Sequence, residues 1–172
     1  MATLKTLILV DFEKEWTDKI SDYFVGDISD LIKKTNKLID YCRKNGYKII
    51  FTTHIEKDSD SVFVANSKNV EIIDDIHKEK SDVIIIKNKI SPFYKTNLDK
   101  ELKGIKEIVI CGILTNLCVR SLAQDAYDRD FRITIIKDCC RAFDVETHEF
   151  TIKDLKATRE EIEFLNLNEF VK

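Results

Sequence analysis

A chain of 172 residues has the length of one domain, and we expect residues 1–172 to form a single domain. The hydrophobic content of 44% and the charged content of 34% are typical of a folded globular protein and exclude a disordered chain. The net charge of −3, with lysines interleaved among acids, argues against nucleic-acid binding.

Small residue counts exclude further classes of protein. The four glycines stand far apart, at positions 26, 46, 104 and 112, so the dinucleotide fingerprint and the P-loop are both absent. Apolar runs such as residues 7–10 are too short to cross a bilayer, and we expect no contact with a membrane. The first residues lack the pattern of a signal peptide, so we expect a cytoplasmic protein with reduced thiols. The five cysteines contain no C-x-x-C pair and indicate neither a zinc site nor a disulfide framework.

Short aliphatic segments alternate with helix-like segments along the chain. In chain order we expect a strand at 4–11, a helix from 29 or 30 to about 45, a strand at 47–53, a weaker helix at 70–80, a strand at 82–87, a short helix at 98–103, a strand at 107–112, a helix at 116–129, a strand at 131–137, a helix at 145–157 and a short strand at 163–167. The strand segments are rich in Ile and Val and mostly continuous, which is typical of a parallel sheet buried on both faces. The pattern predicts an α/β protein: a three-layer α/β/α fold with a mostly parallel, roughly six-stranded, Rossmann-like sheet.

Polar residues stand where these helices need N-caps. Ser29 or Asp30 is the candidate cap of the first helix, Thr115 of the helix at 116–129, and Asp144 of the last helix. The polar, unpatterned segment 56–68 is expected to form a loop over one end of the sheet.

Chemically active side chains stand where the strand segments stop. Asp11 ends the first strand, His54 follows the second and Lys87 ends the third. Because ligands of such folds bind beyond the carboxyl ends of the strands, we expect these side chains at one functional rim.

Cys118 is the candidate nucleophile. If Thr115 is the N-cap, Cys118 lies in the first helical turn, where free N–H groups and the helix dipole lower the pKa of a thiol and can hold an oxyanion. The alternative is a small buried hydrophobic residue, which most free cysteines are. Packing roles are expected for the other four, Cys42, Cys111, Cys139 and Cys140.

Asp11 and Lys87 could assist such a thiol. A carboxylate at the end of the first strand can act as a general base or orient one. A lysine after four apolar residues can keep that carboxylate ionised and favour the thiolate. The alternatives are an Asp that stabilises the loop and an ordinary lysine at a strand end.

Three segments carry a family resemblance. They are LILVDFEKEW at 7–16, KNKISPFYKTNL at 87–98 and CGILTNLCVRSLAQDAYDRDFRITIIKDCC at 111–140. They resemble the isochorismatase-like cysteine hydrolases, which include nicotinamidases, carbamoyl-amidases and ureide amidases. The third segment departs from the family pattern only conservatively, with Ser121 for Thr and Asp130 for Gly. Residues 144–155, with Glu146 and His148, resemble the family's last helix.

The resemblance implies a triad of Cys118, Asp11 and Lys87 that cleaves an amide-type C–N bond of a small molecule. Cys118 would form a thioester, Asp11 would move the proton, and Lys87 would support both. It also implies a cis peptide between Ile113 and Leu114, with the N–H groups of Leu114 and Cys118 facing the oxyanion. A homo-oligomer, a dimer or a tetramer, is expected from the family as well.

Residues beside the triad are expected to wall the substrate pocket. These candidates are Phe12, Trp16, His54, Phe93 and Tyr94, some of which could instead pack in the core. Nicotinamidases carry a metal site of Asp and His residues. Here His54 and Glu56 fall near two of its positions and the set is incomplete, so we expect no metal and no other cofactor.

Two other functions remain open. One is a small-molecule-binding protein of the same fold without turnover, which an intact triad argues against. The other is a nicotinamidase with an atypical metal site. A phosphohydrolase that uses Asp11 is disfavoured, because the D-x-D motif and the phosphate-loop glycines are missing.

Overall fold

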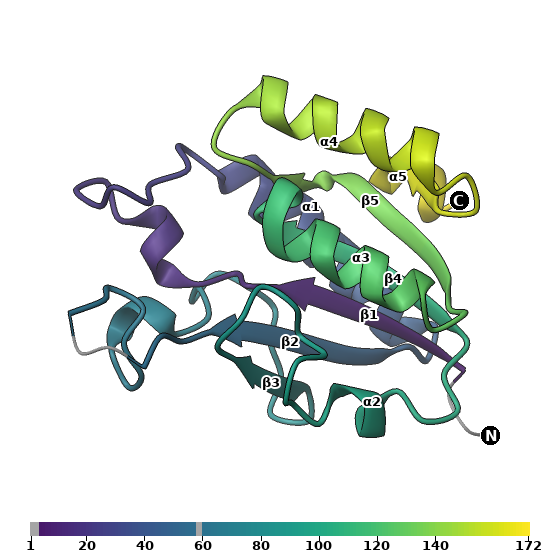
Figure 1. Cartoon of the computed structure of the whole chain (residues 1–172), viewed down its shortest axis with the longest axis horizontal. Coiled ribbons are helices and arrows are strands. Elements are labelled where there is room, and N and C mark those ends of the chain that lie inside the picture. Colours follow the sequence, from purple (N-terminus) through teal and green to yellow (C-terminus); the bar gives the residue numbers. More distant parts are fainter. Residues whose placement is uncertain (1–3, 58–59) are drawn as a thin grey trace.

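The computed structural model describes residues 4–57 and 60–172, and a six-stranded parallel sheet forms its centre (Figure 1). The strands are β1 (Lys5–Val10), β2 (Lys48–His54), β3 (Val83–Lys87), β4 (Glu107–Ile113), β5 (Arg132–Arg141) and β6 (Glu163–Leu165). Their order across the sheet is β3-β2-β1-β4-β5-β6. This confirms the predicted α/β fold with a Rossmann-like sheet, including the short sixth strand.

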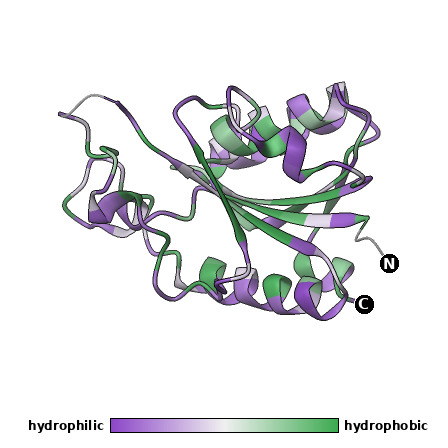
Figure 2. Cartoon of the chain, turned by 90° about the horizontal axis from the view of Figure 1, so that it is seen from below, coloured by the Kyte–Doolittle hydropathy of each residue, from purple (hydrophilic) through white to green (hydrophobic). Residues whose placement is uncertain are grey.

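Helices cover both faces of the sheet (Figure 2). They are α1 (Ser29–Lys44), α2 (Leu98–Glu101), α3 (Arg120–Tyr127), α4 (Val145–Thr158) and α5 (Leu167–Phe170), with short helical turns η1 (Lys14–Thr17), η2 (Lys68–Val70) and η3 (Thr115–Val119). Crossovers between parallel strands are right-handed. The connection from β1 to β2 runs one way along the sheet and those from β4 to β6 run the other way. The helix α1 therefore lies on one face, and α3 and α4 lie on the other.

The central strands are buried on both faces, as their continuous aliphatic runs predicted. Leu7, Ile8, Leu9 and Val10 have no exposed surface. The edge strand β3 differs, since Ile84 and Ile86 are 45% and 59% exposed. In the described part of the connection from β2 to β3 the only helical turn is η2, so no long helix covers these side chains.

The prediction of a helix at 70–80 is wrong. Val70 ends the short turn η2, and Ile72 and Ile73 lie beside the segment that follows β1: Ile72 pairs with Glu13, and the N–H of Ile73 donates to the carbonyl of Phe12 (3.0 Å). These backbone bonds take the place of helical ones, and they hold the 70–73 segment against the end of β1. The chain then turns, with the N–H of Ile76 donating to the carbonyl of Ile73 (3.1 Å).

Two of the other helix starts can be compared with their expected caps. Asp144 caps α4 as predicted, with Oδ1 accepting the N–H of Thr147 (2.7 Å). Ser29 is the first residue of α1 instead of its cap, and Ile28 takes the N-cap position. None of the helices in the described residues combines the length and the apolar character needed to cross a membrane.

Candidate active site

The candidate site lies at the carboxyl ends of β1, β3 and β4. Asp11 follows β1, Lys87 ends β3, and Cys118 lies in η3, the turn directly after β4. The strand order reverses between β1 and β4, because their crossovers run in opposite directions. Ligands of open α/β sheets bind at this kind of switch point.

The ammonium of Lys87 connects the predicted residues. Its Nζ lies 2.7 Å from Oδ2 of Asp11, 3.3 Å from Sγ of Cys118 and 3.3 Å from Nδ1 of His54. The contact with Asp11 is an ion pair, and those with Cys118 and His54 are hydrogen bonds. The side chains of Lys87 and Asp11 are 0% and 1% exposed, so water screens this ion pair little.

Asp11 is held from several sides. Its φ of 51° is in the left-handed region, which Asp tolerates better than most residues. Thr52 donates its hydroxyl to Oδ1 (2.6 Å), and the main-chain N–H of Asp11 donates to the carbonyl of Thr52 (3.1 Å). The indole N–H of Trp16 donates to the carbonyl of Asp11 (2.8 Å). These bonds fix the carboxylate in its place beside Lys87.

The local structure around Cys118 differs from the prediction. The helix does not begin regularly with Thr115 as its cap: η3 is a π-helical turn with Leu114 at the N-cap position. The hydroxyl of Thr115 instead lies 2.8 Å from Nδ1 of His148 on α4. The expected cis peptide between Ile113 and Leu114 is present directly before this turn.

Cys118 is the partly exposed cysteine, while the other four are buried, as their expected packing roles require. Burial, followed by the charge of Asp11, raises the pKa of Cys118 to about 12, and Lys87 lowers it only in part. The prediction of a lowered pKa is therefore wrong. The resting thiol carries its proton, and a nucleophilic role requires a group that takes this proton away.

The electrostatics of the neighbouring groups agree with this arrangement. Burial lowers the pKa of Lys87, but Asp11 and Cys118 outweigh burial and leave that pKa raised, so the ammonium is charged. Burial and then the charge of Lys87 lower the pKa of His54. A neutral imidazole can accept a hydrogen bond at Nδ1, which suits the contact with Lys87.

Trp16 belongs to an aromatic cluster above the site. It is 7% exposed, and its ring lies 5.3 Å from that of Phe63, 6.1 Å from Tyr23 and 6.3 Å from Phe143. Phe63 also contacts the ring of His54, with centroids 5.8 Å apart. Tyr23, Phe63 and Phe143 could not be singled out from the sequence, because they come from separate loops and no local pattern joins them.

The remaining pocket candidates lie elsewhere. Phe12 has no exposed surface and packs in the core, and Phe93 is buried beneath the guanidinium of Arg129, 4.0 Å from its ring centroid. Tyr94 is 46% exposed and lines a cavity of about 390 Å³ that borders Lys87. Because the side chain of Lys87 has no exposed surface, this cavity does not open onto its ammonium.

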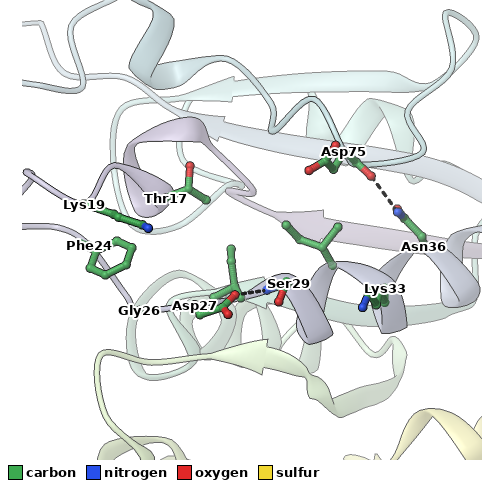
Figure 3. Close-up of a pocket in the computed structure, with 11 residues that line it drawn as sticks. Thr17, Lys19, Phe24, Gly26, Asp27, Ser29, Lys33, Asn36 and Asp75 are labelled. Atoms are coloured by element: carbon green, nitrogen blue, oxygen red, sulfur yellow. Dashed lines mark hydrogen bonds between the residues drawn. The ribbon is translucent and has the colours of Figure 1, made fainter.

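A second cavity, of about 510 Å³, lies at the start of α1 (Figure 3). Lys19, Asp27, Lys33 and Asn36 are among its lining residues, and none of Asp11, Lys87 and Cys118 is. It is therefore separate from the candidate active site.

Glu13 is a site residue that the sequence analysis missed. It is fully buried, and its Oε1 accepts the main-chain N–H of His54 (3.0 Å). Its position two residues after Asp11 was only a weak indication of a role in the site, because nothing in the sequence shows that both side chains are buried.

The donor set beside His54 does not fit the metal site of nicotinamidases. Nε2 of His54 lies 3.8 Å from Glu56, but Nδ1 already faces the ammonium of Lys87, which repels a cation. Within the described residues, no group of three or more His, Cys, Asp and Glu is placed to hold a metal ion. A zinc site needs at least three protein ligands.

Comparison with known proteins identifies the family. A family model described as an isochorismatase domain matches residues 5–163. The chain belongs to the isochorismatase family. An uncharacterised isochorismatase family protein of Bacillus subtilis is 31% identical over 167 residues, which cover 86% of each chain. Nicotinamidase 3 of Arabidopsis thaliana is 28% identical over 151 residues, 79% of this chain and 76% of the relative. The protein is thus an isochorismatase-family hydrolase related to nicotinamidases.

A solved structure supports the fold. The cysteine hydrolase from Pseudomonas syringae pv. phaseolicola superposes with a TM-score of 0.89 at 21% identity, covering 98% of this chain and 91% of that chain. The isochorismatase family fold thus accounts for nearly the whole chain.

Proposed function

We propose that this isochorismatase-family protein is a cysteine-dependent amidohydrolase that cleaves the C–N bond of a small amide. One observation carries the proposal: a single buried ammonium joins Asp11 and Cys118, at 2.7 and 3.3 Å. Two buried charged groups thus meet the partly exposed thiol at the switch point of the sheet. A site of this kind provides a nucleophile, a proton acceptor and a fixed positive charge.

In the first half of the reaction, Sγ of Cys118 attacks the amide carbonyl. Asp11 takes the thiol proton, which the raised pKa of Cys118 makes necessary. The tetrahedral intermediate collapses, the C–N bond breaks, and Asp11 returns the proton to the leaving nitrogen. The products of this half are an amine or ammonia and a thioester on Cys118.

In the second half, water hydrolyses the thioester. Asp11 takes a proton from the water, whose oxygen adds to the acyl carbon. The C–S bond breaks, the carboxylic acid leaves, and the proton returns to Sγ. Lys87 pairs with Asp11 and stabilises the sulfur whenever the sulfur carries negative charge.

We assign the oxyanion to the N–H groups of Leu114 and Cys118. Both belong to the turn after β4. The first N–H groups of a helix have no hydrogen-bond partner within the helix, so they can stabilise a negative charge. The cis peptide that ends at Leu114 lies at this turn.

Two features support a small amide as the substrate. The relatives include a nicotinamidase and an ureidoacrylate amidohydrolase, whose names denote amide hydrolysis. The cluster of Trp16, Tyr23, Phe63 and Phe143 supplies apolar surface near the triad, which suits a small flat molecule.

A panel of small amides and ureido acids tests the proposal, with release of ammonia or amine as the readout. We expect Cys118→Ala to reduce turnover to background, and the matched control Cys42→Ala, which removes a buried thiol from α1, to retain it. Full turnover by Cys118→Ala would contradict the mechanism. Thermal stabilisation by a panel member without turnover would instead favour the binding protein.

A further inference from the structure

Glu13 is a buried carboxyl group beside the triad to which the proposed reaction gives no role. It lies between β1 and η1 and has no exposed surface. Its main-chain N–H donates to the carbonyl of Asp11 (2.9 Å), and it pairs with Ile72 in an isolated antiparallel bridge. The side chain therefore starts from a fixed backbone position.

The two carboxyl oxygens of Glu13 have different contacts. Oε1 accepts the main-chain N–H of His54 at 3.0 Å. Within residues 4–57 and 60–172, Oε2 has no hydrogen-bond partner, and no cationic side chain forms an ion pair with Glu13. The ammonium of Lys87 instead forms an ion pair with Asp11 and hydrogen bonds with Cys118 and His54.

The surroundings of Glu13 favour its protonated form. An ionised carboxylate here would be buried without a paired cation and close to the charge of Asp11. Burial first, and then the charge of Asp11, raise the pKa of Glu13 to about 10; Lys87 and the N–H of His54 oppose this increase, and Glu15 adds to it. With Glu13 neutral, one carboxylate, Asp11, pairs with one ammonium, Lys87.

Glu13 reaches Lys87 through His54. The main chain of His54, the last residue of β2, is bound by Glu13, and its imidazole Nδ1 lies 3.3 Å from Nζ of Lys87. A continuous set of contacts thus leads from the Glu13 carboxyl to the ammonium that joins Asp11 and Cys118.

We propose that Glu13 is a positioning residue, held as the neutral carboxylic acid, which fixes His54 and through it the ammonium of Lys87. The proposal rests on the proposed function, since it concerns the same triad. Glu13 does not touch the thiol. Its neutral form provides an acceptor for the β2 main chain without placing a second negative charge beside Asp11.

The protonation state is tested by carbon-13 NMR on protein labelled at the glutamate carboxyl carbon. The resonance that is missing from Glu13→Gln belongs to Glu13. We expect this resonance to titrate with a midpoint near pH 10. A midpoint near the ordinary value of 4.5 overturns the proposal. This measurement needs no substrate, so its outcome is independent of whether the protein hydrolyses amides.

The positioning role is tested by the rate at which iodoacetamide alkylates Cys118 at about pH 8, followed by mass spectrometry. The ammonium of Lys87 lowers the pKa of Cys118, so displacing it reduces the thiolate fraction and the rate. We expect Glu13→Gln, which keeps the acceptor, to remain within about twofold of the wild type. Glu13→Ala, which leaves the N–H of His54 without its partner, should react about tenfold more slowly.

Glu15 provides a matched control. It is a buried glutamate two residues further on, and its carboxylate bonds to the hydroxyl of Ser21 instead of to His54. We expect Glu15→Gln to leave the alkylation rate of Cys118 unchanged.

Two alkylation results would overturn the proposal. A rate for Glu13→Gln as low as that of Glu13→Ala would mean that the negative charge is needed. A wild-type rate for Glu13→Ala would remove the link through His54. Should Glu13→Ala fail to fold, the NMR titration and Glu13→Gln still decide the matter.

Discussion

Replacing Asp11 by Asn separates the two effects that this carboxylate has on Cys118. The pKa of the thiol is about 12 with Asp11 in place. At about pH 8, some four units lower, roughly one thiol in ten thousand is ionised, a cost of about 5 kcal/mol. In the proposed reaction Asp11 lowers this barrier by accepting the proton as Sγ attacks, and it later protonates the leaving nitrogen. Asn can do neither, so we expect turnover to fall by about 10²–10⁴-fold.

The same substitution should make the thiol easier to ionise. The charge of Asp11 raises the pKa of Cys118, and Lys87 lowers it. Without the carboxylate, Lys87 has the thiolate as its remaining anionic partner. We therefore expect the midpoint of the pH profile for iodoacetamide alkylation of Cys118 to move to lower pH, while turnover falls.

The assay compares amide turnover and the alkylation profile of the wild type with those of Asp11→Asn. Asp144→Asn is the matched control, because Asn caps a helix as well as Asp does and Asp144 caps α4 away from the ammonium. Turnover within tenfold of the wild type, or an alkylation midpoint that moves to higher pH, would refute the reasoning.

The remaining predictions concern stability. Lys87→Met should lower the free energy of unfolding by about 3–5 kcal/mol in urea titrations, because it leaves the carboxylate of Asp11 buried without a cation. A loss of stability below about 1 kcal/mol would argue against a buried ion pair. Gly112→Ala should fold poorly, since its Cβ would lie 2.2 Å from a carbonyl oxygen of β1. Gly46→Ala, whose Cβ meets nothing within 4 Å, should lower the free energy of unfolding by only about 1–2 kcal/mol, because of its left-handed backbone. Equal losses of stability in the two variants would contradict this. Glu13 holds its proton more tightly in the folded protein than in the unfolded chain. Between its ordinary pKa of 4.5 and its raised pKa of about 10, the free energy of unfolding therefore decreases as the pH rises, by up to about 1.4 kcal/mol per pH unit. Glu13→Gln should flatten that part of the stability profile, and an unchanged slope would count against a protonated Glu13.

The sheet could be predicted from the sequence because its aliphatic runs record burial directly. Residues 7–10 are buried on both faces, as a continuous run predicts. The same reasoning failed at Ile84 and Ile86, which are exposed because no long helix covers them in the described part of the connection between β2 and β3. A run of Ile residues does not show whether another part of the chain covers it.

The position of the site could be predicted from the sequence, but its electrostatics could not. Parallel strands bring their carboxyl ends together, so Asp11, Lys87 and Cys118 were expected at one rim, and the ammonium of Lys87 does join them. The raised pKa of Cys118 and the buried Glu13 depend on depth and on neighbours from other strands. No spacing within the sequence carries that information.

The most direct test of the central claim is to trap the acyl group on Cys118. The protein is mixed with the amide that it turns over fastest, quenched in acid during turnover, digested and analysed by mass spectrometry. We predict that the peptide containing Cys118 gains the mass of the acyl group and loses it on treatment with hydroxylamine, which cleaves thioesters. Turnover that persists in Cys118→Ser, or an acyl group on another residue, would contradict the account.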